Sequence, residues 1–237
     1  MIREWINNKR RDKYIRESRM LLNKEGINSL KAFMEVGREL NIDFTVMFGS
    51  LLGAYRDHDF ISHDDDIDMT CDIKCLSAEL LSKLREHGFV IDEIYVASDG
   101  VGVQLPMKFN GLTSDIYFLY DSSDGNKHII LPLALEGKDW SYSAGLNIFS
   151  AKDISLPISD ERTQCIIRDF EINIPSNTND ILKALYGENY MTPIEGAHAN
   201  PPVRYYGLGE KYYTCFPIVL FEESGMISKI KHEIVNE

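Results

Sequence analysis

Four aspartates lie within five consecutive positions of this chain, as Asp64, Asp65, Asp66 and Asp68. Two like charges about 4 Å apart repel each other by roughly 1 kcal/mol in water and by about 4 kcal/mol at an effective dielectric constant of 20. Such a cluster opposes folding unless a counter-charge neutralises it. Hard divalent cations, which bind carboxylate oxygens, supply that charge. We therefore expect a site for Mg²⁺, with Mn²⁺ as the alternative, and a phosphate site beside it.

The acids alternate with apolar residues in the segment Asp66-Ile67-Asp68-Met69. A period of two predicts a β-strand whose two carboxylates face a cleft while Ile67 and Met69 pack into the core. By the same parity Asp64 shares the face of these carboxylates, whereas position 65 does not. Asp64 is therefore the stronger of the two additional site candidates.

A Gly-Ser pair precedes the acids. Residues 43–48 are rich in β-branched and aromatic side chains and predict a strand, which Gly49 and Ser50 would end before a helix begins in residues 51–56. Backbone N–H groups at a helix N-terminus attract phosphate, and a serine hydroxyl adds a donor. We therefore expect Gly49 and Ser50 to hold a phosphate group.

The order strand, Gly-Ser, helix, then a strand with two acids one residue apart resembles the nucleotidyltransferase superfamily. In that superfamily a third acid usually lies on a later strand. The segment 113–119, which alternates polar and apolar residues around Asp115, is the best candidate here. The resemblance implies that Asp115 completes the site, as a metal ligand or as a general base on an acceptor hydroxyl. The sequence leaves these two roles open.

A closer resemblance is to the LicD/fukutin-like phosphotransferase family. Residues 49–56 (Gly-Ser-Leu-Leu-Gly-Ala-Tyr-Arg) and 61–68 (Ile-Ser-His-Asp-Asp-Asp-Ile-Asp) resemble its core, and residues 181–193 resemble a second landmark of the family. Ser50 replaces a threonine of the family pattern and keeps the hydroxyl. Ser62 and His63 replace Pro-Trp and alter a wall beside the acids.

This resemblance implies an α+β fold, with a nucleotidyltransferase-like mixed β-sheet core flanked by helices. It implies a Mg²⁺-dependent transferase that moves a phospho-alcohol, of the phosphocholine, ribitol phosphate or glycerol phosphate type, from a CDP-linked donor to a glycan hydroxyl. The acceptor would be a cell-surface glycan or glycolipid, or its precursor, as in lipopolysaccharide, capsule or teichoic acid modification. Asp66, Asp68 and Asp115 would be the catalytic and metal-binding residues.

Three further residues are candidates for substrate binding. Arg56 follows Gly49 and Ser50 by about one turn and could contact phosphate, or could pair with the aspartates instead. Lys108, which precedes Asp115, could neutralise a phosphate or be a solvated strand lysine. His63 adjoins the acids and could act as a proton carrier or have a structural role only.

Aromatic residues gather near the end of the chain. Tyr186 and Tyr190 belong to the second family landmark, where packing and helix capping explain them without chemistry. Recognition of choline would favour an aromatic cage, although aromatic clusters more often belong to a core. The candidates for a cage are Trp140, Tyr142, Tyr205, Tyr206, Tyr212 and Tyr213.

One domain is expected over residues 1–237, with a helical segment 1–40, a catalytic core 42–193 and a C-terminal extension 194–237. Apolar periodicity predicts helices to about residue 40, over 76–87 and up to Tyr186, the last capped by Asn179 or Asp180. Strands are predicted over 89–96, 101–109, 113–119, 129–135 and 146–149, with a turn at 122–126. Residues beyond Pro193 carry no clear pattern.

The charge is uneven along the chain. Residues 1–24 hold eight basic and three acidic side chains, a net charge of +5. Because the whole chain has a net charge of −12, residues 25–237 carry −17. An acidic body excludes a broad nucleic-acid footprint. The basic helix could contact the inner face of an anionic membrane or form a solvated face.

A cytoplasmic location is expected. The chain shows no apolar run of transmembrane length and no signal-peptide pattern. The four cysteines, which are consistent with buried free thiols in a reducing compartment, are Cys71, Cys75, Cys165 and Cys215.

Four other classes of protein share parts of this pattern. A nucleotidyltransferase would take a nucleoside triphosphate and release pyrophosphate. A glycosyltransferase with an Asp-x-Asp motif usually needs a larger nucleotide-binding half than the 65 residues before Asp66. A calcium-binding EF-hand loop is disfavoured because Met69 and Cys75 stand where Gly and Glu are required. A non-catalytic relative is disfavoured by the complete set of acids.

Overall fold

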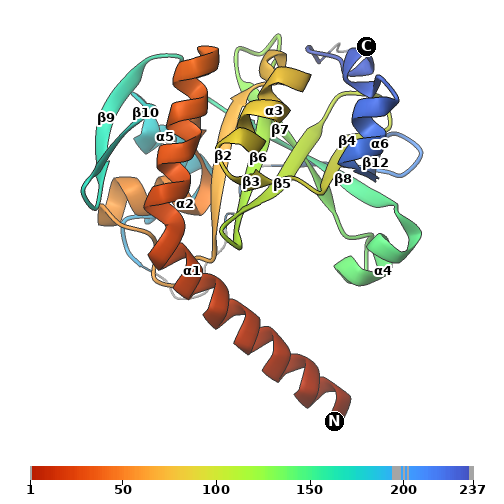
Figure 1. Ribbon diagram of the computed structural model, residues 1–237, viewed down its shortest axis with the longest axis horizontal. Helices are drawn as coiled ribbons and strands as arrows, with labels where there is room; N and C mark the ends of the chain where they lie inside the picture. The colour runs from red at the N-terminus through yellow and green to blue at the C-terminus, as the bar shows by residue number, and fades with distance from the viewer. Residues whose placement is uncertain (1, 194–198, 200, 202, 235–237) are drawn as a thin grey trace.

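The computed structural model describes residues 2–193, 199, 201 and 203–234, with side chains from residue 13 onward (Figure 1). The helices are α1 Ile2–Leu40, α2 Phe48–Leu52, α3 Ala78–Glu86, α4 Trp140–Leu146, α5 Thr178–Tyr186 and α6 Ile218–Glu223. A π-helical turn spans Gly53–Asp57, and 3-10 turns span Ile73–Cys75 and Met226–Lys229. The α+β class expected from the sequence is confirmed.

The strands of the main sheet are β1 Thr45–Val46, β2 Asp66–Asp72, β3 Phe89–Val90, β4 Glu93–Ala97, β5 Val103–Phe109, β6 Leu112–Asp121, β7 Lys127–Leu133, β8 Phe149–Leu156, β11 Val203–Tyr206 and β12 Tyr212–Pro217. A separate hairpin consists of β9 Arg162–Ile167 and β10 Phe170–Pro175. The sheet is mixed, because β2 runs parallel to β6 whereas β5 and β7 run antiparallel to it.

Strand β6 organises this sheet. Its first part pairs with β2 on one side and β5 on the other, and its last residues pair with β7. Since the order continues from β7 through β8, β12 and β4 back to β5, these six strands close into a ring. Strand β2 lies outside this ring, next to β6, with β1 beyond it, and the acid-bearing strand β2 therefore lies beside the strand of Asp115.

Helices α1 and α3 lie across one face of the sheet (Figure 1). The apolar stripe of α1 packs there, with Phe33 fully buried at 4.4 Å from the ring centroid of Phe89 and 5.5 Å from that of Phe44. A buried contact of 3.2 Å between the hydroxyls of Ser29 and Ser114 ties α1 to β6. With this face filled by α1 and α3, the acidic side chains Asp66 and Asp68 of β2 and Asp115 of β6 lie on the other.

The first turns of α1 extend away from the rest of the protein (Figure 1). The length of α1, which spans Ile2–Leu40, confirms the predicted N-terminal helix. The side chains of Arg3, Lys9, Arg10 and Arg11, part of the expected basic surface, lie outside the described residues. Within the described part of the chain, no helix has the length and apolar character needed to cross a bilayer.

Several predicted boundaries are wrong. The helix after the first strand begins at Phe48 and includes Gly49 and Ser50, so the strand before it is only Thr45–Val46. Asn177, rather than Asn179 or Asp180, precedes α5, and its amide serves the neighbouring loop by accepting the backbone N–H of Ser159 at 3.1 Å.

The strand predicted over 146–149 is also wrong at its start, because helix α4 occupies residues 140–146 and β8 begins at Phe149. The strand predicted over 89–96 is divided into β3 and β4. The described part of the 194–237 extension contributes β11, β12 and α6 to the sheet and its cover.

Candidate functional site

Strands β2 and β6 bring the three principal acids together. Asp68 lies directly opposite Asp115 in the parallel pair, and Asp66 lies opposite Thr113. Paired residues of neighbouring strands project to the same side, so all three carboxylates share one face. Oxygen atoms of Asp66, Asp68 and Asp115 lie within 4.8 Å of one another, as do those of Asp64, Asp65 and Asp66. Asp66 belongs to both groups.

Burial makes this cluster costly. Asp68 is 8% exposed and Asp115 is 5% exposed. Burial, followed by the charge of Asp64, raises the pKa of Asp66 to about 8, and burial with the charge of Asp66 raises the pKa of Asp68 well above its usual value. Burial also raises the pKa of Asp64 and of Asp115 to about 6. The site therefore holds protons unless a cation replaces them.

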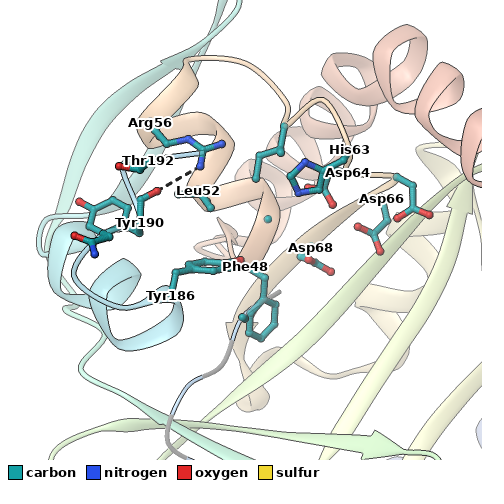
Figure 2. A pocket seen from close by; sticks show the side chains of 15 residues that line it. Phe48, Leu52, Arg56, His63, Asp64, Asp66, Asp68, Tyr186, Tyr190 and Thr192 are labelled. Carbon is teal, nitrogen blue, oxygen red and sulfur yellow. Dashed lines mark hydrogen bonds between the residues drawn. The ribbon is translucent and has the colours of Figure 1, made fainter. Parts of the chain in front are cut away.

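The acids form one side of a cavity of about 370 Å³ (Figure 2). The cavity is lined by Phe48, Gly49, Leu52, Arg56, Ile61, His63, Asp64, Asp65, Asp66, Asp68, Tyr186, Asn189, Tyr190, Thr192 and Ala199. Segments far apart in the sequence thus meet here, namely the turn before β2, the start of β2 and the end of α5. Four of the candidate site residues, Gly49, Arg56, His63 and Asp64, lie in the lining. Asp65, which parity placed off the face of the other acids, lies there as well.

Gly49 is packed against Asp64. A Cβ atom built on Gly49 would overlap the Asp64 carboxylate, with the carboxyl carbon only 3.0 Å away. No side chain fits at position 49 unless Asp64 moves. The glycine therefore allows the carboxylate to lie directly against the backbone of α2, which explains why a small residue is needed here.

Ser50 is placed differently from the expectation that it directly faces a phosphate. It is 2% exposed, and its hydroxyl oxygen accepts the backbone N–H of Asp68 at 3.1 Å. The backbone N–H of Met47 in turn donates to the carbonyl of Asp68 at 2.9 Å. These two bonds, one to the N–H and one to the C=O of Asp68, fix β2 against the start of α2. Ser50 thus positions the strand that carries the acids.

Arg56 lies in the cavity wall, but its charge is already paired. Its guanidinium donates to both carboxylate oxygens of Asp57, at 2.8 and 2.7 Å, and to the carbonyl oxygen of Tyr190 at 3.3 Å (Figure 2). The expected alternative, an ion pair with the aspartates of the cluster, is therefore wrong, because Arg56 pairs with Asp57 instead. The bond to Tyr190 ties the turn after α2 to the segment after α5.

Lys108 lies in the same cross-strand row as Asp66, because it pairs with Thr113, which pairs with Asp66. It stands two strands away from that aspartate, is exposed, and does not line the cavity in the described part of the chain. The structure therefore does not bring Lys108 to the cavity with the other candidates.

Two residues that sequence reasoning missed support the acids. Gln104 of β5 donates its amide N–H to Asp115 at 2.6 Å and lies 3.5 Å from the Tyr117 hydroxyl. The hydroxyl of Tyr117 also interacts with the Asp68 carboxylate, whose pKa it lowers. Cross-strand register creates these contacts, and no local motif in the sequence could indicate them.

Phe48 is a further missed residue. Its backbone has φ +48°, a conformation that is rare for a bulky side chain and that often marks functional sites. The Phe48 ring lines the cavity and contacts Tyr117 edge-to-face, with ring centroids 5.3 Å apart.

The aromatic residues at the cavity are not those expected for a cage. Phe48, Tyr186 and Tyr190 line it, whereas Trp140 packs on Phe149 with ring centroids 4.6 Å apart. Tyr206 donates to Asp153 at 3.3 Å, and the buried Tyr213 donates to a carbonyl of β7 at 2.6 Å. The other three candidates, Tyr142, Tyr205 and Tyr212, are exposed. None of the six lies in this cavity's described lining.

The donor set is suited to a hard divalent cation. Carboxylate oxygens converge from two strands, burial and mutual repulsion raise their pKa values, and the cation in the described lining, Arg56, is paired with Asp57. Such clusters favour Mg²⁺ or Mn²⁺ over softer metals that prefer nitrogen and sulfur ligands. Asp66, Asp68 and Asp115 could hold one ion, and Asp64 and Asp65 could extend the site from Asp66.

Comparison with known proteins finds a family model that matches part of this chain. Residues 41–141 match the family model described as LicD/FKTN/FKRP, nucleotidyltransferase domain. No curated protein matches the chain. The matched segment contains the Gly-Ser pair, the acidic cluster and Asp115, and it ends before the Tyr186 and Tyr190 side of the cavity. Over residues 41–141 the chain is therefore similar to the LicD family.

Proposed function

We propose that this protein transfers a phospho-alcohol from a CDP-linked donor to a hydroxyl of a cell-surface glycan or its precursor, with Mg²⁺ at Asp66, Asp68 and Asp115. The observation that carries this proposal is the convergence of these three carboxylates, of which Asp66 and Asp68 line a cavity of about 370 Å³ and Asp115 lies buried beside them. The similarity of residues 41–141 to the LicD family model supports a phosphotransferase type of function on glycans. We also propose that the sheet has the nucleotidyltransferase type of fold.

The arrangement suits phosphoryl transfer, in which catalysis consists mainly of positioning and charge neutralisation. A divalent cation held by the three acids would neutralise charge on the phosphoryl group and on the leaving oxygen. Gly49 lets the backbone of α2 lie close to the Asp64 carboxylate, and Ser50 fixes β2 against that helix. Gln104 holds one oxygen of Asp115 and leaves the other available.

The chemistry of the cavity also favours one class of donor. Asp64 and Asp65 add negative charge beyond the three principal acids, and the rings of Phe48, Tyr186 and Tyr190 line the same space. Carboxylates beside aromatic rings stabilise cationic groups such as quaternary ammonium. We therefore propose an amine-bearing alcohol, of the choline type, ahead of the neutral ribitol and glycerol types.

A second candidate is nucleotidyl transfer from a nucleoside triphosphate. The matched family description names a nucleotidyltransferase domain, and the same carboxylates would hold the metal that accompanies a triphosphate. This reaction would release pyrophosphate, whereas transfer from a CDP-alcohol would release CMP. The released product separates the two candidates.

A thermal-shift panel tests the proposal. The protein is melted with CDP-choline, CDP-ribitol, CDP-glycerol, CTP, ATP, UDP-glucose and CMP, each with and without Mg²⁺. A ligand at about 100 times its dissociation constant stabilises by about 2.7 kcal/mol, which is visible as a rise in melting temperature. A Mg²⁺-dependent response to a CDP-alcohol, lost in Asp68→Asn, supports the proposal. A response only to triphosphates favours nucleotidyl transfer, and one only to UDP-glucose favours glycosyl transfer.

A further inference from the structure

Tyr186 is the last residue of α5. It reaches into the cavity from the side opposite Asp66 and Asp68 (Figure 2). The helix is held rigidly, because Ile181, Leu182 and Leu185 are fully buried in the core. Gly187 follows with φ +86°, which ends the helix directly after Tyr186. The position of the Tyr186 ring is therefore set by the core packing of α5.

The hydroxyl of Tyr186 faces negative charge. Burial, and then the charges of Asp68 and Asp64, raise its pKa above the ordinary value for tyrosine, while Arg56 acts in the opposite direction. The phenol therefore stays protonated at neutral pH and keeps a hydrogen to donate. Tyr186 lines the same cavity as the acidic cluster and Arg56.

Other tyrosines at the site use their hydroxyl groups within the protein, and Tyr186 does not. Tyr190 donates to the side chain of Asn179 at 2.9 Å, and Tyr117 interacts with Asp68. Among the described residues, no protein group forms a hydrogen bond with the Tyr186 hydroxyl. A half-buried O–H group without a protein partner, directed into a cavity, is suited to a ligand.

A phosphate held by a metal at the acids has oxygen atoms on its far side that need donors. Arg56 already gives hydrogen bonds to Asp57 and to the Tyr190 carbonyl. We propose that the Tyr186 hydroxyl donates a hydrogen bond to a phosphate oxygen of the donor substrate and so forms the second half of the phosphate site. This inference rests on the proposed function in one respect only, that the site takes a metal-bound phosphate or diphosphate.

The test measures binding rather than turnover. Mg²⁺-pyrophosphate is titrated calorimetrically into wild type, Tyr186→Phe and Tyr206→Phe. Phenylalanine keeps the ring and removes only the hydroxyl. Tyr206 is the matched control, because its hydroxyl bonds to Asp153 away from the cavity. Hydrogen bonds to charged groups are worth about 1.5–3 kcal/mol, so Tyr186→Phe should weaken binding about 10- to 100-fold, and Tyr206→Phe less than about 2-fold.

Melting curves show whether both variants remain folded. The inference is overturned if Tyr186→Phe binds within about 2-fold of wild type, or if wild type binds no Mg²⁺-pyrophosphate. Failure of the proposed function gives a different result. In that case CDP-alcohols are not turned over, while the loss of pyrophosphate binding in Tyr186→Phe persists and supports the inference. If CDP-alcohols are turned over but Tyr186→Phe binds normally, only the inference fails.

Discussion

Asp68 on β2 and Asp115 on β6 lie directly opposite each other on two parallel strands, and both are almost completely buried. Neighbouring strands lie about 4.8 Å apart, so their carboxylates cannot avoid each other. The repulsion is an energetic cost that β2 and β6 retain. A divalent cation would turn this cost into a favourable interaction, and several measurable consequences follow from that relationship.

Replacement of Asp68 with asparagine should separate stability from activity. The variant removes a buried carboxylate whose ionised form is strongly disfavoured, so the metal-free protein should melt at a higher temperature at pH 8. Loss of a metal ligand should lower turnover by at least about 100-fold, since even changes to the outer partners of metal ligands cost 10- to 100-fold. The measurements are melting curves with and without Mg²⁺, and turnover of the donor identified in the ligand panel.

Asp72→Asn is the matched control for that experiment. Asp72 ends the same strand and is partly exposed, and asparagine can still accept the backbone N–H of Lys74, which Asp72 binds at 2.8 Å. This variant should keep the full response to Mg²⁺. If Asp68→Asn also kept it, Asp68 would not be a ligand.

The stability of the metal-free protein should fall as pH rises from about 5 to about 8. The pKa values of Asp64 and Asp115 are raised to about 6 and that of Asp66 to about 8, whereas an unfolded aspartate titrates near 3.9. Between these values the folded protein binds more protons than the unfolded chain, so the free energy of unfolding decreases with pH. Melting curves in EDTA at several pH values measure this slope.

Mg²⁺ should oppose that slope, because the metal binds ionised carboxylates and competes with protons. The difference between curves in EDTA and in Mg²⁺ isolates the acidic site. His128, whose pKa Asp153 raises, also lowers stability as pH rises, but it contributes equally to both curves. Parallel curves under the two conditions would contradict a metal site formed by these acids.

The parts of the site that depend on local patterns could be predicted from the sequence. Alternation of acidic and apolar residues correctly indicated the strand of Asp66 and Asp68 and that of Asp115. Helix α1 and the end of α5 before Gly187 were likewise confirmed, because long apolar periodicity and a glycine after the last turn are strong signals.

The parts that depend on long-range register could not be predicted. Closure of the strand ring through β5 and β6, and with it the contact of Gln104 with Asp115, follows from pairings that no local motif encodes. The hairpin of β9 and β10 turns at Arg168 with φ +57°, without the Asn-Gly or Asp-Gly pair that usually indicates such a turn. Phe48 adopts a positive φ that its residue type disfavours, so the early start of α2 had no signal.

Gln104 should affect metal affinity without lying in the cavity. Gln104→Met keeps the approximate length of the side chain and removes the N–H that donates to Asp115. Outer partners of metal ligands typically contribute 10- to 100-fold to affinity, so we expect a loss of that size for Mg²⁺, or for Mn²⁺ measured calorimetrically.

The control for Gln104→Met is Gln164→Met, a change of the same type on the exposed face of β9. It should leave the affinity within about 2-fold. Equal affinities for both variants would show that Asp115 is held in place without Gln104, and would leave the amide with a role in packing only.

A methyl group added at Gly49 should damage the site, whereas one added at Gly145 should not. The new Cβ atom of Gly49→Ala would overlap the Asp64 carboxylate, and overpacking of this kind costs about 1–3 kcal/mol. Gly145 lies in α4 with open space around it, and alanine there should stabilise the protein by about 0.4–1 kcal/mol. Chemical denaturation in EDTA gives both free energies of unfolding.

The same pair of variants then tests whether Asp64 belongs to the metal site. Relief of the overlap requires Asp64 to turn away from α2, so Gly49→Ala should bind Mg²⁺ more weakly than wild type, and Gly145→Ala should bind it equally well. If Gly49→Ala is destabilised but its Mg²⁺ affinity is unchanged, the metal is held without Asp64, by the three acids of β2 and β6. Asp64 would then serve the substrate side of the cavity, where it already lies in the lining.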